Sequence, residues 1–141
     1  MDFLFSQEGR NKIKQGIDTT ANAIKVTLGA KGRNVIIRTS NNRPYITKDG
    51  VTVANSIYLK DPVEDMGATL VKEAAIKTVE QAGDGTTTVS VLLQALVDKC
   101  NEQLMKKDVN ILELKKGVEY AVVQTIQYLK ENSIKVENID I

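Results

Sequence analysis

Apolar residues recur at helical spacing along most of the chain, and the first such run follows Ser6. Ser6 is a favourable N-cap residue, and Gly29 lies where a glycine commonly ends a helix. The apolar positions between them are Ile13, Ile17, Ala21, Ile24 and Leu28. This spacing predicts one amphipathic helix whose apolar face packs on a core.

Three further segments show the same period, at residues 62–82, 89–104 and 111–129. Pro62 suits the first turn of a helix that Asp61 would cap, and Asn110 with Glu113 forms a capping-box analogue. The positions expected to face the core are Val63, Gly67, Leu70, Val71, Ala74 and Thr78 in the first segment, Val89, Leu92, Leu93, Leu96, Val97, Cys100 and Leu104 in the second, and Ile111, Leu114, Val118, Ala121, Val122, Thr125 and Leu129 in the third.

A β-hairpin is expected between the first two helices. Residues 34–39 are rich in β-branched side chains, residues 40–44 have turn composition, and residues 45–47 would form the returning arm. Residues 51–59 have a mixed period, so both a short helix and a strand remain open. Residues 1–5 are compatible with a short strand or a frayed end, and residues 133–141 with an apolar strand or a connector. The predicted fold class is mainly α, a bundle of long helices with a small β-hairpin.

Composition narrows the function classes. The 141 residues carry a net charge of +1, and they include no histidine, no tryptophan and a single cysteine, Cys100. Balanced charge and few aromatic residues argue against nucleic-acid binding, and no run is apolar and long enough for a membrane span. Histidine-based catalysis and an internal disulfide are excluded. Cys100 lies on an apolar stripe, which favours a structural thiol, and without a signal peptide the chain is expected to be cytoplasmic.

The turn at residues 83–88 carries the strongest candidate chemistry. Gly83 and Gly85 bracket Asp84, and three threonines follow where the next helix should begin. Free N–H groups and the helix dipole attract anions at such a position. A carboxylate fits beside a phosphate if a divalent cation lies between them, which predicts a magnesium–nucleotide site. A tight turn with threonine caps is an equally supported alternative, and no Walker A motif is present.

Two other turns offer weaker signals. Residues 27–34 form a glycine-punctuated loop with the cations Lys31 and Arg33, and it could cradle a phosphate or a nucleoside. Lys48 and Asp49 precede Gly50 and could reach a phosphate and a metal-bound water. Taken separately, both segments also suit ordinary solvated turns, and that simpler interpretation is favoured for each.

These three turns together resemble the group I chaperonins, the GroEL family. The matching stretches are Val26-Thr27-Leu28-Gly29-Ala30-Lys31-Gly32-Arg33-Asn34, Ile46-Thr47-Lys48-Asp49-Gly50-Val51 and Ala82-Gly83-Asp84-Gly85-Thr86-Thr87-Thr88. Their order and spacing resemble the first half of the family's equatorial domain. The resemblance covers nearly the whole chain, and it implies an ATP-driven protein-folding machine built as a ring of subunits.

The resemblance also implies roles for individual residues, with ATP and Mg²⁺ as cofactors. Asp49 corresponds to a carboxylate beside the γ-phosphate that is implicated in hydrolysis, Asp84 to the carboxylate that binds magnesium, and Lys48 to an ATP contact. The remaining implied nucleotide contacts are Thr27, Leu28, Gly29 and Ala30 in the first loop and Gly85, Thr86, Thr87 and Thr88 in the third.

The chain departs from the family in one residue and in length. Ala30 replaces the usual proline, which should loosen the first loop slightly. Residues 1–132 would form the first half of an equatorial ATP-binding domain, and residues 133–141 would begin the connector to an intermediate domain. The apical domain, through which the family binds unfolded clients and a co-chaperonin, has no counterpart in these residues.

Two functions follow from this resemblance. The first is a subunit, or part of one, of an ATP-dependent chaperonin that forms rings with other chaperonin subunits. The second is a truncated ATP-binding or oligomerisation module without turnover. For this chain by itself we expect exposed apolar surface and ATP hydrolysis near background.

Overall fold

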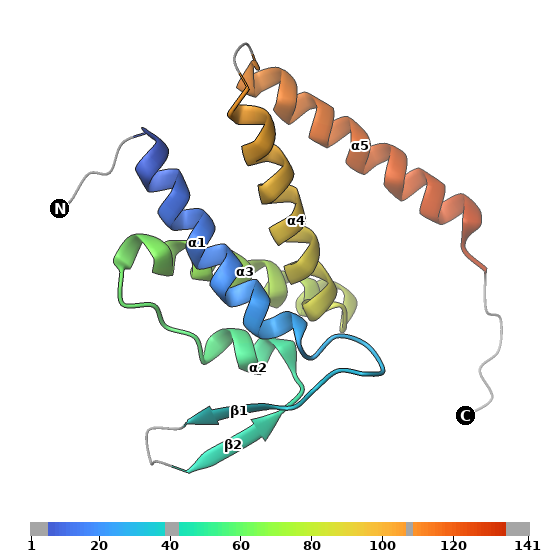
Figure 1. Ribbon diagram of the computed structural model, residues 1–141. Coiled ribbons are helices and arrows are strands. Elements are labelled where there is room, and N and C mark those ends of the chain that lie inside the picture. The colour runs from blue at the N-terminus through green and yellow to red at the C-terminus, as the bar shows by residue number, and fades with distance from the viewer. Residues whose placement is uncertain (1–5, 39–42, 107–108, 135–141) are drawn as a thin grey trace. The chain divides into compact units, whose positions relative to one another are not determined.

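The computed structural model describes residues 6–38, 43–106 and 109–134. The expectations for residues 1–5, for most of the turn at 40–44 and for the tail from residue 135 therefore lie outside the described residues. The described elements follow the order α1 (Ser6–Lys25), β1 (Val35–Arg38), β2 (Pro44–Thr47), α2 (Gly50–Asn55), α3 (Pro62–Ala82), α4 (Thr86–Leu104) and α5 (Ile111–Asn132) (Figure 1). Long helices with one small antiparallel sheet confirm the predicted fold class.

The chain divides into two units, residues 1–99 and 100–141. In the first unit, α1 lies against α3 at very short range, because glycines stand at the contact. A methyl group at residue 16 would lie 1.8 Å from the Glu64 carbonyl oxygen, and one at residue 67 would lie 2.1 Å from the Ile13 carbonyl oxygen. The two backbones therefore touch where larger residues would hold them apart.

The core of this unit lies between α1, α2 and α3. Its buried residues are Ile17, Ile24, Val53, Ala54 and Val71. On α1 the predicted apolar face is confirmed at Ile17, Ala21 and Ile24, which are almost completely buried. Burial of these side chains is the main favourable contribution to the fold of this unit.

Helix α1 ends at Lys25, earlier than the predicted stop at Gly29. The N–H groups of Thr27 and Leu28 bond to carbonyls three residues back, at 3.0 and 3.1 Å, so the last turn tightens. Leu28 consequently leaves the core face and is 45% exposed. The sequence pattern gave no sign of this tightening, because Leu28 continues the helical spacing.

Helix α2 begins shortly after β2 (Figure 1). Strands β1 and β2 pair antiparallel, with Val35 opposite Thr47 and Arg38 opposite Pro44. Residues 51–59, for which the sequence allowed either a helix or a strand, begin within α2. Asp49 caps this helix by accepting hydrogen bonds from the N–H groups of Val51 and Thr52. This cap favours a helix in a segment whose apolar spacing alone is compatible with both a helix and a strand.

Helices α3 and α4 bury fewer of the predicted positions. Asp61 caps α3 as expected, and Gly67 and Val71 are buried, but Leu70 is 49% exposed. On α4, Leu93 and Val97 pack partly on the core, whereas Leu92 and Leu96 are 62% and 44% exposed. The predicted stripes were too wide because each helix contacts the core along a narrow face.

The second unit contains α5, which Asn110 caps through the Leu112 N–H as predicted. None of the residues of α5 is buried, and its large apolar side chains include Val122 and Leu129 at 50% and 60% exposure. The expected exposed apolar surface is therefore present. No helix in the described part of the chain has the length and apolarity needed to cross a bilayer.

The contact between α1 and α3 yields the first prediction. We expect Gly67→Ala to lower the free energy of unfolding by roughly 1–3 kcal/mol, because the added methyl group would clash with the Ile13 carbonyl. Gly117→Ala on α5, where no atom lies within 4 Å, should be neutral or stabilising by up to about 1 kcal/mol. Urea unfolding of both variants measures the difference, and equal midpoints would contradict this account of the contact.

Candidate functional site

The three turns singled out in the sequence line one pocket of about 440 Å³ in the first unit. Its lining residues are Thr27, Leu28, Gly29, Lys48, Asp49, Gly50, Asp84, Gly85, Thr86, Thr87 and Thr88. Of the predicted site residues, only Ala30 is not part of this lining; it is exposed on the loop after α1. Segments separated by more than fifty positions thus contribute to one concave surface.

The first wall of the pocket is the loop that follows α1. Thr27 is 8% exposed, and its hydroxyl donates to the Ile24 carbonyl at 2.7 Å. The same oxygen lies 3.2 Å from the Thr87 hydroxyl, so Thr87 is the donor in that second bond. This hydroxyl pair joins the loop after α1 to the first turn of α4, a connection that no sequence motif indicated.

The second wall is the start of α2, where Gly50 is buried against both neighbouring walls. A methyl group at residue 50 would lie 2.8 Å from Thr87 Oγ1, 3.0 Å from Thr86 Oγ1 and 3.3 Å from Ile24 Cγ2. Gly50 therefore permits an approach that any side chain would prevent. The sequence predicts only a turn at Gly50 and not this role, because the contact depends on distant residues.

Asp49 both caps α2 and lines the pocket. Its carboxylate accepts hydrogen bonds from the Thr52 hydroxyl at 2.5 Å, the Thr52 N–H at 2.9 Å and the Val51 N–H at 3.3 Å. The Thr52 hydroxyl lowers the pKa of Asp49 below its usual 3.8, and the two N–H groups add to this against a smaller opposing effect of burial. Asp49 is thus a fixed, ionised carboxylate at the pocket wall.

The third wall is the turn between α3 and α4. Gly83 ends α3 in the left-handed conformation with φ of 75°, and Gly85 has φ of 93°, values that suit glycine. Between them, the Asp84 carboxylate accepts a bond from the Gly85 N–H at 2.6 Å, its one hydrogen bond with the described residues. Asp84 is exposed, so its carboxylate retains capacity for a further partner.

The amino end of α4 differs from those of α2, α3 and α5. In these three helices Asp49, Asp61 and Asn110 accept hydrogen bonds from first-turn N–H groups. The residue before α4 is Gly85, which has no side chain to do so. Because first-turn N–H groups lack intrahelical acceptors, those of α4 remain available at the pocket. The arrangement suits an anion.

The residues also define what kind of metal site is compatible with the pocket. No cluster of three or more His, Cys, Asp or Glu side chains able to hold a metal occurs among the described residues. Zinc and calcium sites in proteins usually take three or more protein ligands. Mg²⁺ differs, since one or two carboxylates suffice when phosphate oxygens and water complete its coordination. Asp84 fits that requirement.

Comparison with known proteins relates this chain to chaperonins, both by sequence and by structure. The sequence profile of the TCP-1/cpn60 chaperonin family matches residues 20–140. The structure resembles the crystal structure of the chaperonin gp146 from the bacteriophage EL 2 (Pseudomonas aeruginosa), determined in the presence of ATP-BeFx. That match has a TM-score of 0.76 and 34% sequence identity, and it covers 93% of this chain but 22% of the phage protein.

The capping role of Asp49 yields a prediction about pH. Asp49→Ala should lower the free energy of unfolding by about 1 kcal/mol near neutral pH, because α2 loses its N-cap. Since folding lowers the Asp49 pKa, the ionised carboxylate stabilises the folded state at pH values above 3.8. The difference between wild type and variant should shrink as the pH falls through the lowered pKa.

Urea unfolding at about pH 7 and about pH 3 measures this change. Asp84→Ala is the matched control, since Asp84 accepts a hydrogen bond only from its neighbour Gly85 among the described residues. The control should show a much smaller effect at either pH. A deficit in Asp49→Ala that is the same at both pH values would contradict the proposed carboxylate cap.

Proposed function

The chain belongs to the TCP-1/cpn60 chaperonin family, and from this we propose that its pocket binds ATP together with Mg²⁺. The observation that carries the proposal is the uncapped amino end of α4, which lines the pocket next to Asp84. Unpaired N–H groups beside a lone carboxylate suit a phosphate group that a cation bridges to the protein. The phage chaperonin crystallised with ATP-BeFx supports the same ligand class.

Each wall of the pocket would have its own part in binding. The first-turn N–H groups of α4 and the hydroxyl of Thr88 would donate to phosphate oxygens, with the helix dipole adding a favourable field. Lys48, which also lines the pocket, would offset further negative charge. The loop from Thr27 to Gly29 would contact the rest of the nucleotide. Ala30 stays a prediction as a nucleotide contact, since it lies outside the pocket lining.

The role of the metal would depend on Asp84. A bare carboxylate repels a triphosphate, and magnesium removes that repulsion by binding both. When bound, Mg²⁺ would draw negative charge away from the phosphates and make the terminal one easier to transfer. Asp84 would hold the metal, while the backbone of Gly85 would keep the carboxylate in place.

Asp49 is the residue we propose for hydrolysis. Its carboxylate is ionised and held by three donors, so it can accept a hydrogen bond from a water molecule without reorienting. A fixed acceptor facing the pocket would orient such a water toward the terminal phosphate. Thr52 would keep the acceptor in position.

The activity of the whole machine is a broader proposal, because this chain spans 22% of the length of the phage chaperonin. We assign residues 1–132 to the first half of an equatorial ATP-binding domain and residues 133–141 to the start of a connector. With the rest of a chaperonin subunit, the chain would form rings with other subunits in the cytoplasm and couple ATP hydrolysis to protein folding. Clients and a co-chaperonin would bind through an apical domain.

A second function, ATP binding and oligomerisation without turnover, is favoured by the large apolar side chains exposed on α5. Such a surface suits association with other subunits. Both functions share the nucleotide pocket and differ in phosphate release. One variant tests nucleotide binding in the pocket, and another tests turnover.

The first concerns Asp84. Asp84→Asn should weaken ATP binding in the presence of Mg²⁺ by about tenfold or more, because the amide loses the charge that holds the cation. Binding with the metal chelated should change little. Calorimetric titration with and without Mg²⁺ measures both affinities. Glu80→Gln, which removes a charge from an exposed position on α3, is the matched control and should bind as wild type does. If Asp84→Asn also matches wild type, Asp84 does not hold the metal.

The second concerns Asp49. For this chain alone we expect phosphate release near background, and for a complete ring we expect Asp49→Asn to slow release about a hundredfold while ATP affinity stays within about twofold. Through its one oxygen Asn can still accept the bonds that Thr52 donates, so α2 should remain capped and folded. Steady-state phosphate release and calorimetry separate the two effects. Unchanged turnover in the variant ring would remove Asp49 from the reaction.

A further inference from the structure

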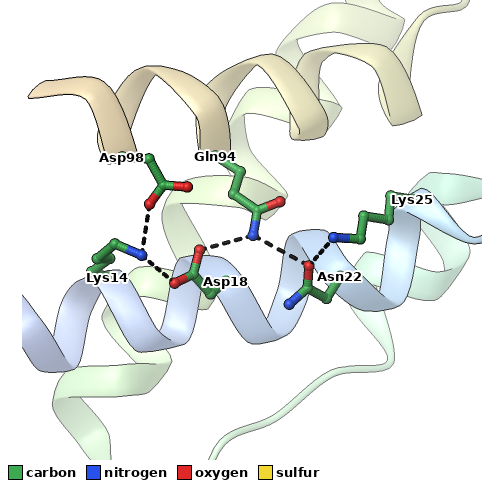
Figure 2. Close-up of polar contacts among 6 residues, drawn as sticks. All are labelled: Lys14, Asp18, Asn22, Lys25, Gln94 and Asp98. Carbon is green, nitrogen blue, oxygen red and sulfur yellow. Dashed lines mark hydrogen bonds and ion pairs between the residues drawn. The ribbon is translucent and has the colours of Figure 1, made fainter.

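A line of polar contacts joins α1 to α4 outside the pocket (Figure 2). The Gln94 side-chain nitrogen donates to Asp18 Oδ1 at 2.8 Å and to Asn22 Oδ1 at 3.2 Å. Lys14 Nζ lies 2.5 Å from Asp18 Oδ2 and 2.6 Å from Asp98 Oδ1. Lys25 donates to Asn22 at the other end of the line. We call these six residues the polar seam.

The seam runs toward the pocket. Lys14 pairs with Asp98, then Asp18 and Asn22 with Gln94, so positions rise along α1 as they fall along α4. The next contact in this antiparallel order is the hydroxyl pair Thr27–Thr87, which lies in the pocket wall. The seam and the pocket are therefore successive parts of one interface between the two helices.

The apolar contacts of α4 with the rest of the first unit are partial. Its buried residues are Thr86 and Ser90, and the Ser90 hydroxyl bonds within its own helix to the Thr86 carbonyl. Leu93 and Val97 reach the core but are only partly buried. Apolar contacts are non-directional, so they permit sliding that directed hydrogen bonds restrict.

Within the seam, Gln94 is the central contact. The ion pairs of Lys14 are partly exposed, with side-chain exposures of 29–40%, and such pairs contribute little individually. The Gln94 amide instead holds two residues one turn apart on α1, which fixes both the spacing and the register of the helices. A carboxylate in its place would face Asp18 and Asp98 and be repelled.

We propose that Gln94 is a positioning residue for the pocket: by holding Asp18 and Asn22, its amide sets the separation between the loop after α1 and the first turn of α4. The consequence for ligand binding rests on the proposed Mg²⁺–ATP function. The consequence for the separation of Thr27 and Thr87 does not. The two consequences can therefore be measured separately.

The test compares three variants of the full chain. Gln94→Met removes both hydrogen bonds at similar side-chain length. Gln94→Glu adds repulsion, and Gln94→Glu with Asp18→Asn reverses the polarity of the bond, so that an amide at 18 donates to a carboxylate at 94. Gln103→Met is the matched control, because it loses only a local bond from Lys106 on a glutamine elsewhere in α4.

Two readouts are used for each variant. Calorimetry gives the affinity for ATP with Mg²⁺, and the nuclear Overhauser effect between the methyl groups of Thr27 and Thr87 reports their separation without ligand. Gln94→Met should weaken both, the affinity by about threefold to tenfold, and Gln94→Glu should weaken them further. The double variant should bring the affinity to within about twofold of wild type, a rescue that loss of helix stability alone would not produce.

The outcomes separate the inference from the proposed function. Unchanged affinity and unchanged methyl contact in Gln94→Met would overturn the inference, as would a double variant no better than Gln94→Glu alone. If the wild-type chain binds no ATP, the proposed function fails. The contact between the methyl groups of Thr27 and Thr87 then tests the role of Gln94 by itself. Loss of that contact in Gln94→Met with recovery in the double variant supports the inference, and its persistence in Gln94→Met overturns it.

Discussion

Gly50 lets three segments of the chain meet at one point, and the pocket depends on that meeting. A methyl group there would crowd the hydroxyls of Thr86 and Thr87 and, less closely, Ile24, so these side chains would have to shift. The start of α2, the end of α1 and the start of α4 could then not approach as closely. Because Asp49 is the adjacent residue and caps α2, the same contact fixes where its carboxylate stands.

Two kinds of interaction hold this meeting point in place. Close backbone packing at Gly16 and Gly67 and the apolar core set α1 against α3, with little freedom to adjust. The attachment of α4 is different, since hydroxyls, amides and partly exposed ion pairs contribute much of it. A rigid frame with a polar, weaker attachment would allow α4 to respond to what lies in the pocket.

The sequence predicted the parts of the fold that depend on local chemistry. Asp61 and Asn110 cap their helices because a short polar side chain at that position can accept hydrogen bonds from the first-turn N–H groups. The turns that line the pocket were also found, because glycines, a carboxylate and hydroxyls at helix ends carry a chemical meaning of their own. Their assembly into one site came from the family resemblance, since spacing along a chain does not define distances in space.

The misses have a common physical cause. Leu70 and Leu92 fit a helical stripe but face solvent in the first unit, because tertiary contact and not period decides which side of a helix is covered. Gln94 and Gly50 gave no signal because their importance lies in partners that are far away along the chain. The tight last turn after α1 was hidden by Leu28, whose apolar side chain continued the period.

The central claim is that a nucleotide lies with its phosphates against the amino end of α4. A crystal structure of the chain with Mg²⁺ and a non-hydrolysable ATP analogue tests this most directly. We expect phosphate oxygens within hydrogen-bonding distance of the first-turn N–H groups that begin at Thr86, and a magnesium ion between Asp84 and the phosphates. A nucleotide bound elsewhere, or a metal without Asp84 as a ligand, would contradict the account.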